Sequence, residues 1–158
     1  MHLYMKKRTK RIILFIIVAL CFICAIYKML HPVGNLSDTA TIEVEYHGNY
    51  FWVPEETDII KFSLTDHEKI KYICKNIKSL AWEKIFFANK PSSTIFLLRF
   101  FDEKGKEIEY LEILNNNHQI NFPNRNTKPY STIKGEIDLQ YLYDLVEEYW
   151  NDNINKEK

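Results

Sequence analysis

The densest group of aromatic and acidic side chains in the sequence lies between residues 50 and 58. Three aromatic residues follow one another there, and three carboxylates come shortly after them. If the aromatic run is a strand, successive side chains point to opposite faces, so the rings cannot all be buried. Exposed aromatics beside carboxylates are typical of protein-binding patches, whereas a calcium loop needs a longer array of oxygen ligands. We therefore predict a partner-binding site here, with an ordinary solvated acidic loop as the alternative. The residues are Tyr50, Phe51, Trp52, Glu55, Glu56 and Asp58.

Residues that could support catalysis, or hold a metal or a cofactor, are scattered along the chain. The sequence contains no nucleotide-binding glycine loop, no zinc-protease motif and no serine-hydrolase motif. His67 stands between Asp66 and Glu68, but neighbouring side chains at a helix start diverge, and helix capping accounts for them. We therefore predict no catalytic residue, no cofactor and no metal site. A small enzyme whose site the sequence does not reveal is the alternative.

The three cysteines offer little chemistry. Cys21 and Cys24 form a C-x-x-C pair, but both lie inside an apolar run with no histidine or carboxylate near them, where cysteine acts as a small hydrophobe. Cys74 falls on the apolar side of a predicted helix, so we expect a buried, inert thiol. One cysteine outside the apolar run cannot form an internal disulfide.

The N-terminal segment has the pattern of a membrane anchor. Residues 12–27 carry no charge, and the apolar run reaches residue 30 if Lys28 extends its ammonium group to the interface. We predict a transmembrane signal-anchor helix over residues 12–30. Five basic residues precede it, so residues 1–11 are expected to form a cytoplasmic stub. The expected topology is a single pass through the cell (inner) membrane, with the remaining chain on the extracytoplasmic side.

A cleaved signal peptide is the alternative, and it would give a secreted or periplasmic protein. Its cleavage site should carry two small residues in an A-x-A-like pattern. The best candidate, Ile23-Cys24-Ala25, supplies only one of them.

The zero net charge of the chain hides a strong asymmetry. Of the 21 basic side chains, six lie in residues 1–30, which contain no acidic residue. Residues 31–158 therefore carry 15 basic against 21 acidic side chains, a net charge of −6. Such a charge disfavours nucleic acid as a partner and favours basic or mixed protein surfaces.

Residues 31–40 resemble a linker, residues 41–150 a folded domain, and residues 151–158 a frayed polar tail. Within the domain, strands and helices are predicted from the spacing of apolar residues. A Thr65–Glu68 capping box opens the first helix, and Asp138 caps the second. The segment 82–88 is ambiguous between helix and strand. The expected strands are Thr41–Tyr46, 50–53, 60–64, Thr94–Phe101, Glu107–Leu114, 118–122 and an edge strand at 130–137.

This order of elements predicts the α+β class. We expect a transmembrane helix followed by an antiparallel sheet with two amphipathic helices packed on one face, the other face being partly open. Arg99 interrupts an apolar strand, so it either lies at a sheet face or edge or contacts a partner. Glu107 and Glu109 are two residues apart in one strand and are expected to share a face.

The layout resembles small single-pass bacterial envelope proteins of unknown function, and in size and charge it is similar to membrane-anchored immunity proteins. The resemblance rests on the basic start at residues 6–11, the hairpin at residues 102–106 and the closing helix at residues 138–150. It implies a membrane-tethered, non-catalytic domain that binds an unidentified protein partner, as an immunity protein or inhibitor. The alternative is an accessory subunit of a membrane complex that acts through its transmembrane helix.

Overall fold

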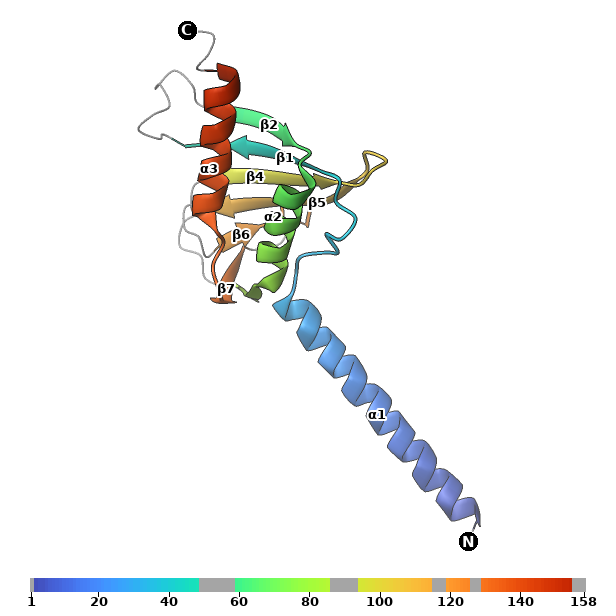
Figure 1. The fold of residues 1–158 in the computed structure, drawn as a ribbon. Coiled ribbons are helices and arrows are strands. Elements are labelled where there is room, and N and C mark those ends of the chain that lie inside the picture. Colours follow the sequence, from blue (N-terminus) through green and yellow to red (C-terminus); the bar gives the residue numbers. More distant parts are fainter. Residues whose placement is uncertain (1, 49–58, 86–93, 115–118, 126–128, 155–158) are drawn as a thin grey trace.

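The computed structural model describes residues 2–48, 59–85, 94–114, 119–125 and 129–154, with side chains described from Thr9 to Asn153 within these ranges (Figure 1). The helices are α1 (His2–Leu30), α2 (His67–Ser79) and α3 (Leu139–Tyr149), with short turns of other helix types at Pro123–Arg125 and Trp150–Ile154. The strands are β1 (Thr41–Tyr46), β2 (Ile60–Leu64), β3 (Ala81–Lys84), β4 (Thr94–Phe101), β5 (Glu107–Leu114), β6 (Gln119–Asn121) and β7 (Tyr130–Lys134). The protein is therefore α+β, as predicted.

The described strands form one sheet in the order β2-β1-β4-β5-β6-β7-β3, and every neighbouring pair is antiparallel. The predicted edge strand at 130–137 is wrong in its position. β7 ends at Lys134 and lies second from the edge, because β3 pairs with its outer side. α2 ends at Ser79 and β3 begins at Ala81, so the first part of the ambiguous segment 82–88 is a strand.

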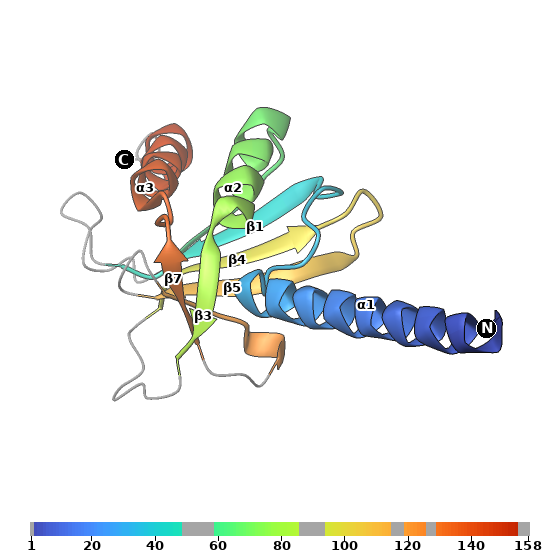
Figure 2. The same cartoon turned by 90° about the horizontal axis from the view of Figure 1, so that it is seen from below.

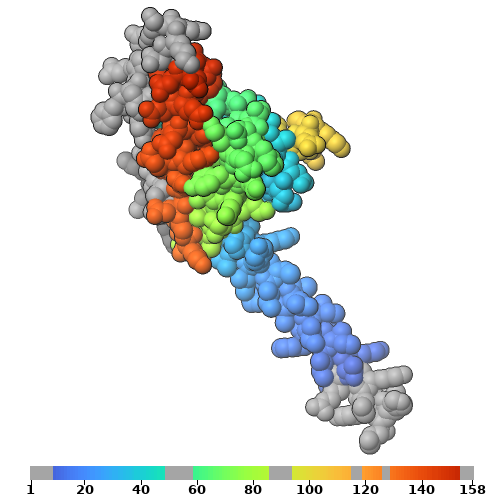
Figure 3. Space-filling view, viewed as in Figure 1, coloured from blue at the N-terminus to red at the C-terminus, as the bar shows by residue number. Residues whose placement is uncertain are grey.

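α1 is long and apolar enough to cross a membrane. The qualifying stretch is Thr9–Leu30, 22 residues with a mean hydropathy of 2.8, and none of it is buried against the rest of the protein. At about 1.5 Å per residue it spans about 33 Å, slightly more than the ~30 Å hydrocarbon core of a bilayer. The helix already begins at His2, so the basic N-terminal residues belong to it. Figures 1 and 3 show α1 leaving the domain as a bare helix.

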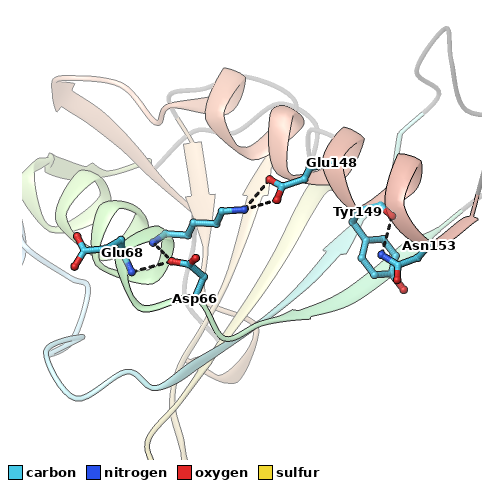
Figure 4. Close-up of polar contacts among 6 residues, drawn as sticks. Asp66, Glu68, Glu148, Tyr149 and Asn153 are labelled. Atoms are coloured by element: carbon cyan, nitrogen blue, oxygen red, sulfur yellow. Dashed lines mark hydrogen bonds and ion pairs between the residues drawn. The ribbon is translucent and has the colours of Figure 1, made fainter.

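The N-cap of α2 is Asp66, and not Thr65 of the predicted capping box. The Asp66 carboxylate accepts hydrogen bonds from the backbone N–H groups of Glu68 and Lys69, each at 3.0 Å (Figure 4). Thr65 lies one residue too early, because the first helical residue is His67. The buried residues of the helix are Ile70, Ile73, Cys74 and Ile77, so Cys74 lies on the apolar side as predicted.

α3 begins as predicted, with the Asp138 side chain accepting a hydrogen bond of 3.1 Å from the backbone N–H of Tyr141. Leu142, Leu145 and Val146 are its buried residues. The opposite side of the helix is polar and exposed: Gln140, Asp144, Glu147 and Glu148.

α2 and α3 lie side by side on the same side of the sheet (Figure 2). Lys69 donates two hydrogen bonds to the Glu148 carboxylate, at 2.6 and 2.7 Å (Figure 4), and the Tyr72 hydroxyl donates one to Asp138 at 2.5 Å. The hydrogen bond to Glu148 is the largest influence on Lys69 and raises its pKa. A single cluster of buried side chains contains residues of both helices together with the inward residues of the strands, so these elements share one core.

Residues 31–40 contain no helix or strand, yet they are fixed to the domain. Leu36 is only 1% exposed and belongs to the core cluster. The backbone N–H of Gly34 donates to Glu109 at 3.0 Å, and the carbonyl of Pro32 accepts from Arg125 at 2.7 Å. α1 therefore joins the domain through a short segment that is packed and hydrogen-bonded.

Candidate functional site

The predicted partner-binding residues lie in the chain between β1 and β2, outside the residues that the structure describes. The prediction at this segment therefore remains a prediction. The residues concerned are Tyr50, Phe51, Trp52, Glu55, Glu56 and Asp58.

The structure shows a second group of candidate residues, on the side of β1, β2, β4 and β5 that points away from α2 and α3. No described helix covers this side (Figure 2). Because side chains alternate along each strand, most polar residues of these strands collect there, and the residues that define this side are not buried. We call this surface the outer face and define it by Glu43, Glu45, Lys61, Ser63, Leu97, Arg99, Tyr110 and Glu112.

A shallow hollow of about 530 Å³ lies on the outer face. Leu97 lines it together with charged residues of β1, β2 and β4 and the ring of Tyr110. An apolar floor with a charged rim is the arrangement in which a partner side chain gains both burial and orientation.

Arg99 is the centre of the charge cluster on this face. Its guanidinium lies 3.5 Å from the Glu43 carboxylate, 3.2 Å from that of Glu107, and 5.2 Å from the centre of the Tyr110 ring. The Arg99 side chain is 48% exposed. Arg99 therefore lies at a sheet face, which was one of the two predicted positions. Exposed ion pairs contribute only about 0–1 kcal/mol, so these contacts orient the guanidinium more than they stabilise the fold.

Glu45 forms the other charge cluster. Its carboxylate lies 2.6 Å from the ammonium group of Lys61 and 2.7 Å from Nε2 of His47. Partial burial raises the pKa of Glu45, but the hydrogen bonds from Lys61 and His47 together outweigh it, so the net pKa is lowered. The group is therefore a carboxylate that stays charged in mild acid.

Tyr110 places an aromatic ring between these charges. Burial is the main cause that raises the pKa of its hydroxyl, and the nearby Glu112 carboxylate raises it further, against the opposing effect of Arg99. Tyr110 is thus a neutral hydrogen-bonding group with a partly exposed ring, a combination that is frequent in protein interfaces. Tyr110 is not among the residues that were predicted to form a site.

Glu107 and Glu109 do not share a face, which corrects the prediction. Glu109 lies opposite Phe100 whereas Glu107 lies opposite Phe101, because a register shift inserts one extra residue in β5. Glu107 therefore pairs with Arg99 at the outer face, while Glu109 is 7% exposed and pairs with Arg125. The sequence carries no local signal for this bulge.

Among the described residues, no three side chains of histidine, cysteine, aspartate or glutamate are grouped so as to hold a metal ion. His67 is the first residue of α2, next to the Asp66 carboxylate that caps the helix, as the capping interpretation predicted. Cys21 and Cys24 are free and exposed along α1, and Cys74 is free and buried.

The arrangement on the outer face offers paired charges, a tyrosine and a shallow apolar floor, which suit recognition of another protein surface. Comparison of the chain with protein-family models, with curated proteins and with solved structures gave no match.

Proposed function

We propose that this protein is a membrane-tethered, extracytoplasmic and non-catalytic protein-interaction domain, acting as an immunity protein or inhibitor in a bacterial cell envelope. In this proposal α1 crosses the membrane once, with its basic start in the cytoplasm. The layer of α2 and α3 packs on one face of the sheet, and the outer face binds the partner.

The observation that carries the proposal is the composition of the outer face. Four carboxylates and two basic side chains surround Tyr110 and Leu97: Glu43, Glu45, Glu107 and Glu112 with Lys61 and Arg99. Arginine and tyrosine are enriched among the residues that contribute most to binding energy. The acidic excess agrees with the −6 charge of residues 31–158 and favours a partner with a basic or mixed surface.

Site-directed photocrosslinking in membranes tests this assignment. A photoreactive phenylalanine analogue at Tyr110 should crosslink to a defined partner, whereas the same analogue at the exposed Gln140 of α3 should not. The change Arg99→Glu should abolish the crosslink, because it reverses the charge at the centre of the face. Equal crosslinking from both positions, or a crosslink that persists in Arg99→Glu, would contradict the proposal.

A second candidate function uses α1 itself. The apolar side chains of its Thr9–Leu30 stretch are not buried against the rest of the described protein, so they are available to meet another membrane helix. In this case the protein is an accessory subunit, and replacing residues 12–30 with an unrelated spanning helix should abolish its activity. The first proposal expects activity to survive that replacement, because α1 there acts only as a tether.

A further inference from the structure

A second hollow, of about 630 Å³, lies where α1 meets the domain. The last turn of α1 contributes Tyr27 and Lys28, and the packed segment after it contributes His31. α2 contributes Lys78 from its last turn, and Figure 1 shows this end of α2 close to the end of α1. Trp82 of β3 also lines the hollow.

The charges around this junction hollow are opposite to those of the outer face. Lys28, Lys78 and Arg125 line it, and no described aspartate or glutamate does. Arg125 is compensated by Glu109. Lys28 forms no ion pair with a described residue, and the ammonium group of Lys78 contacts only neutral oxygens, of Asn35 at 3.4 Å and Ser37 at 3.3 Å. Two uncompensated ammonium groups therefore face one hollow.

Trp82 adds a hydrogen-bond donor that lacks an acceptor. The side chain is 1% exposed, and its indole N–H has no hydrogen-bond partner among the described residues. Leaving a buried donor unpaired costs about 1–3 kcal/mol, so such groups are uncommon unless a ligand or water completes them. The indole N–H itself is enclosed by the protein, so Trp82 contributes to the wall of the hollow and not a donor to a bound group.

The position of the hollow indicates which anion would bind there. It lies at the end of the Thr9–Leu30 apolar stretch, where a spanning helix leaves the hydrocarbon core and reaches the phosphate layer. Tyr27 packs on His31 there, with ring centres 4.5 Å apart, and tyrosine is enriched at this depth.

We propose that the junction hollow binds the headgroup phosphate of an anionic glycerophospholipid in the extracytoplasmic leaflet. Lys28 and Lys78 supply the positive charge that the phosphate requires, and Trp82 forms part of the wall of the hollow. This inference rests on the membrane anchoring in the proposed function and is independent of partner binding at the outer face. The binding would fix the domain close to the bilayer with the outer face free.

The test uses the full chain in a neutral detergent, titrated with phosphatidylglycerol or with phosphatidylcholine of the same acyl chains. Native mass spectrometry measures the bound lipid. We expect tighter retention of phosphatidylglycerol, and an approximately fivefold loss of its affinity for each of Lys28→Gln and Lys78→Gln. The matched controls are Lys10→Gln at the other end of α1 and Lys75→Gln, which lies three residues before Lys78 and does not line the hollow.

Three results of the lipid titration would overturn the inference. The first is equal retention of the two lipids, and the second is equal losses in the control variants. The third is displacement of phosphatidylglycerol by millimolar inorganic phosphate, since the hollow would then be a site for free phosphate. Membrane fractionation of the Lys28→Gln/Lys78→Gln variant distinguishes a loss of lipid binding from a loss of membrane anchoring. A variant that is still anchored remains in the membrane fraction. A wild-type chain absent from that fraction would overturn both proposals.

Discussion

The buried carboxylate of Glu109 and the guanidinium of Arg125 form an ion pair beneath the segment that follows α1. The same carboxylate oxygen accepts the backbone N–H of Gly34, and the same guanidinium donates to the carbonyl of Pro32. The guanidinium also lies 4.1 Å from the centre of the Phe122 ring. One ion pair thus connects β5 to the segment that follows α1.

Removing one member of this pair should destabilise the domain. Arg125→Met leaves the Glu109 carboxylate buried with its main partner gone. Breaking a fully buried pair costs about 3–5 kcal/mol, but the Arg125 side chain is 38% exposed, so we expect a loss of about 2 kcal/mol in the free energy of unfolding. Urea unfolding of the full chain in detergent, followed by circular dichroism, measures this loss.

Arg99→Met is the matched control, because it removes the same functional group from the exposed pairs of the outer face. We expect it to cost less than 1 kcal/mol. If the two variants lose similar stability, the Glu109–Arg125 pair has no special structural role.

The start of α2 gives a second stability prediction. Asp66→Ala removes the acceptor of two backbone hydrogen bonds and should cost about 1 kcal/mol. Thr65→Ala should stay within about 0.5 kcal/mol of wild type, since Thr65 is exposed and precedes the cap. Thermal unfolding of both variants decides whether Asp66 or Thr65 is the N-cap of α2. A larger loss of stability in Thr65→Ala would support the capping box of Thr65 and Glu68.

Cys74 should be chemically silent in the folded protein. Burial is the main cause that raises the pKa of its thiol, against a weaker opposing hydrogen bond to Thr39, so little reactive thiolate forms near neutral pH. In a Cys21→Ala/Cys24→Ala background, a thiol reagent should modify Cys74 only as the protein unfolds. Rapid modification under native conditions would show that this part of the core opens.

The elements with a regular apolar pattern were predictable from the sequence. The alternation in Thr41–Tyr46 and the buried side of α2 required only the periodicities of strand and helix. The helix over Thr9–Leu30 required only length and hydropathy. In each case a local pattern and the tertiary structure favour the same conformation.

The features that were missed depend on contacts between distant parts of the chain. The inner position of β7 arises because β3, about 50 residues earlier, pairs with it. The burial of Glu109 needs both the bulge in β5 and Arg125. The outer face and the junction hollow likewise assemble residues from separate elements, and no spacing within one segment encodes such a group.

The Glu45 carboxylate should contribute to a pH dependence of stability. Partial burial opposes its ionisation, but the hydrogen bonds from Lys61 and His47 prevail and lower its pKa in the folded state. The contribution is therefore present above the ordinary glutamate pKa and is lost as the pH falls through the lowered value. Carbon-13 NMR titration should show the pKa of Glu45 rising in Lys61→Gln and unchanged in Lys71→Gln, a lysine on α2. A Glu45 pKa that stays unchanged in Lys61→Gln would contradict the assignment of Lys61 as a cause of the lowered pKa.

The orientation of α1 can be tested by the side of the membrane on which each end lies. In a chain whose three cysteines are replaced by alanine, Lys134→Cys places a thiol on the exposed end of β7, and Lys10→Cys places one at the basic end of α1. A membrane-impermeant maleimide added to spheroplasts of an expression host should label the first variant at once and the second only after lysis, because the basic residues keep that end in the cytoplasm. The intact mass of the membrane-extracted protein should include residues 1–30. A mass lacking them would indicate a cleaved signal peptide, and labelling of Lys10→Cys in intact spheroplasts would reverse the topology.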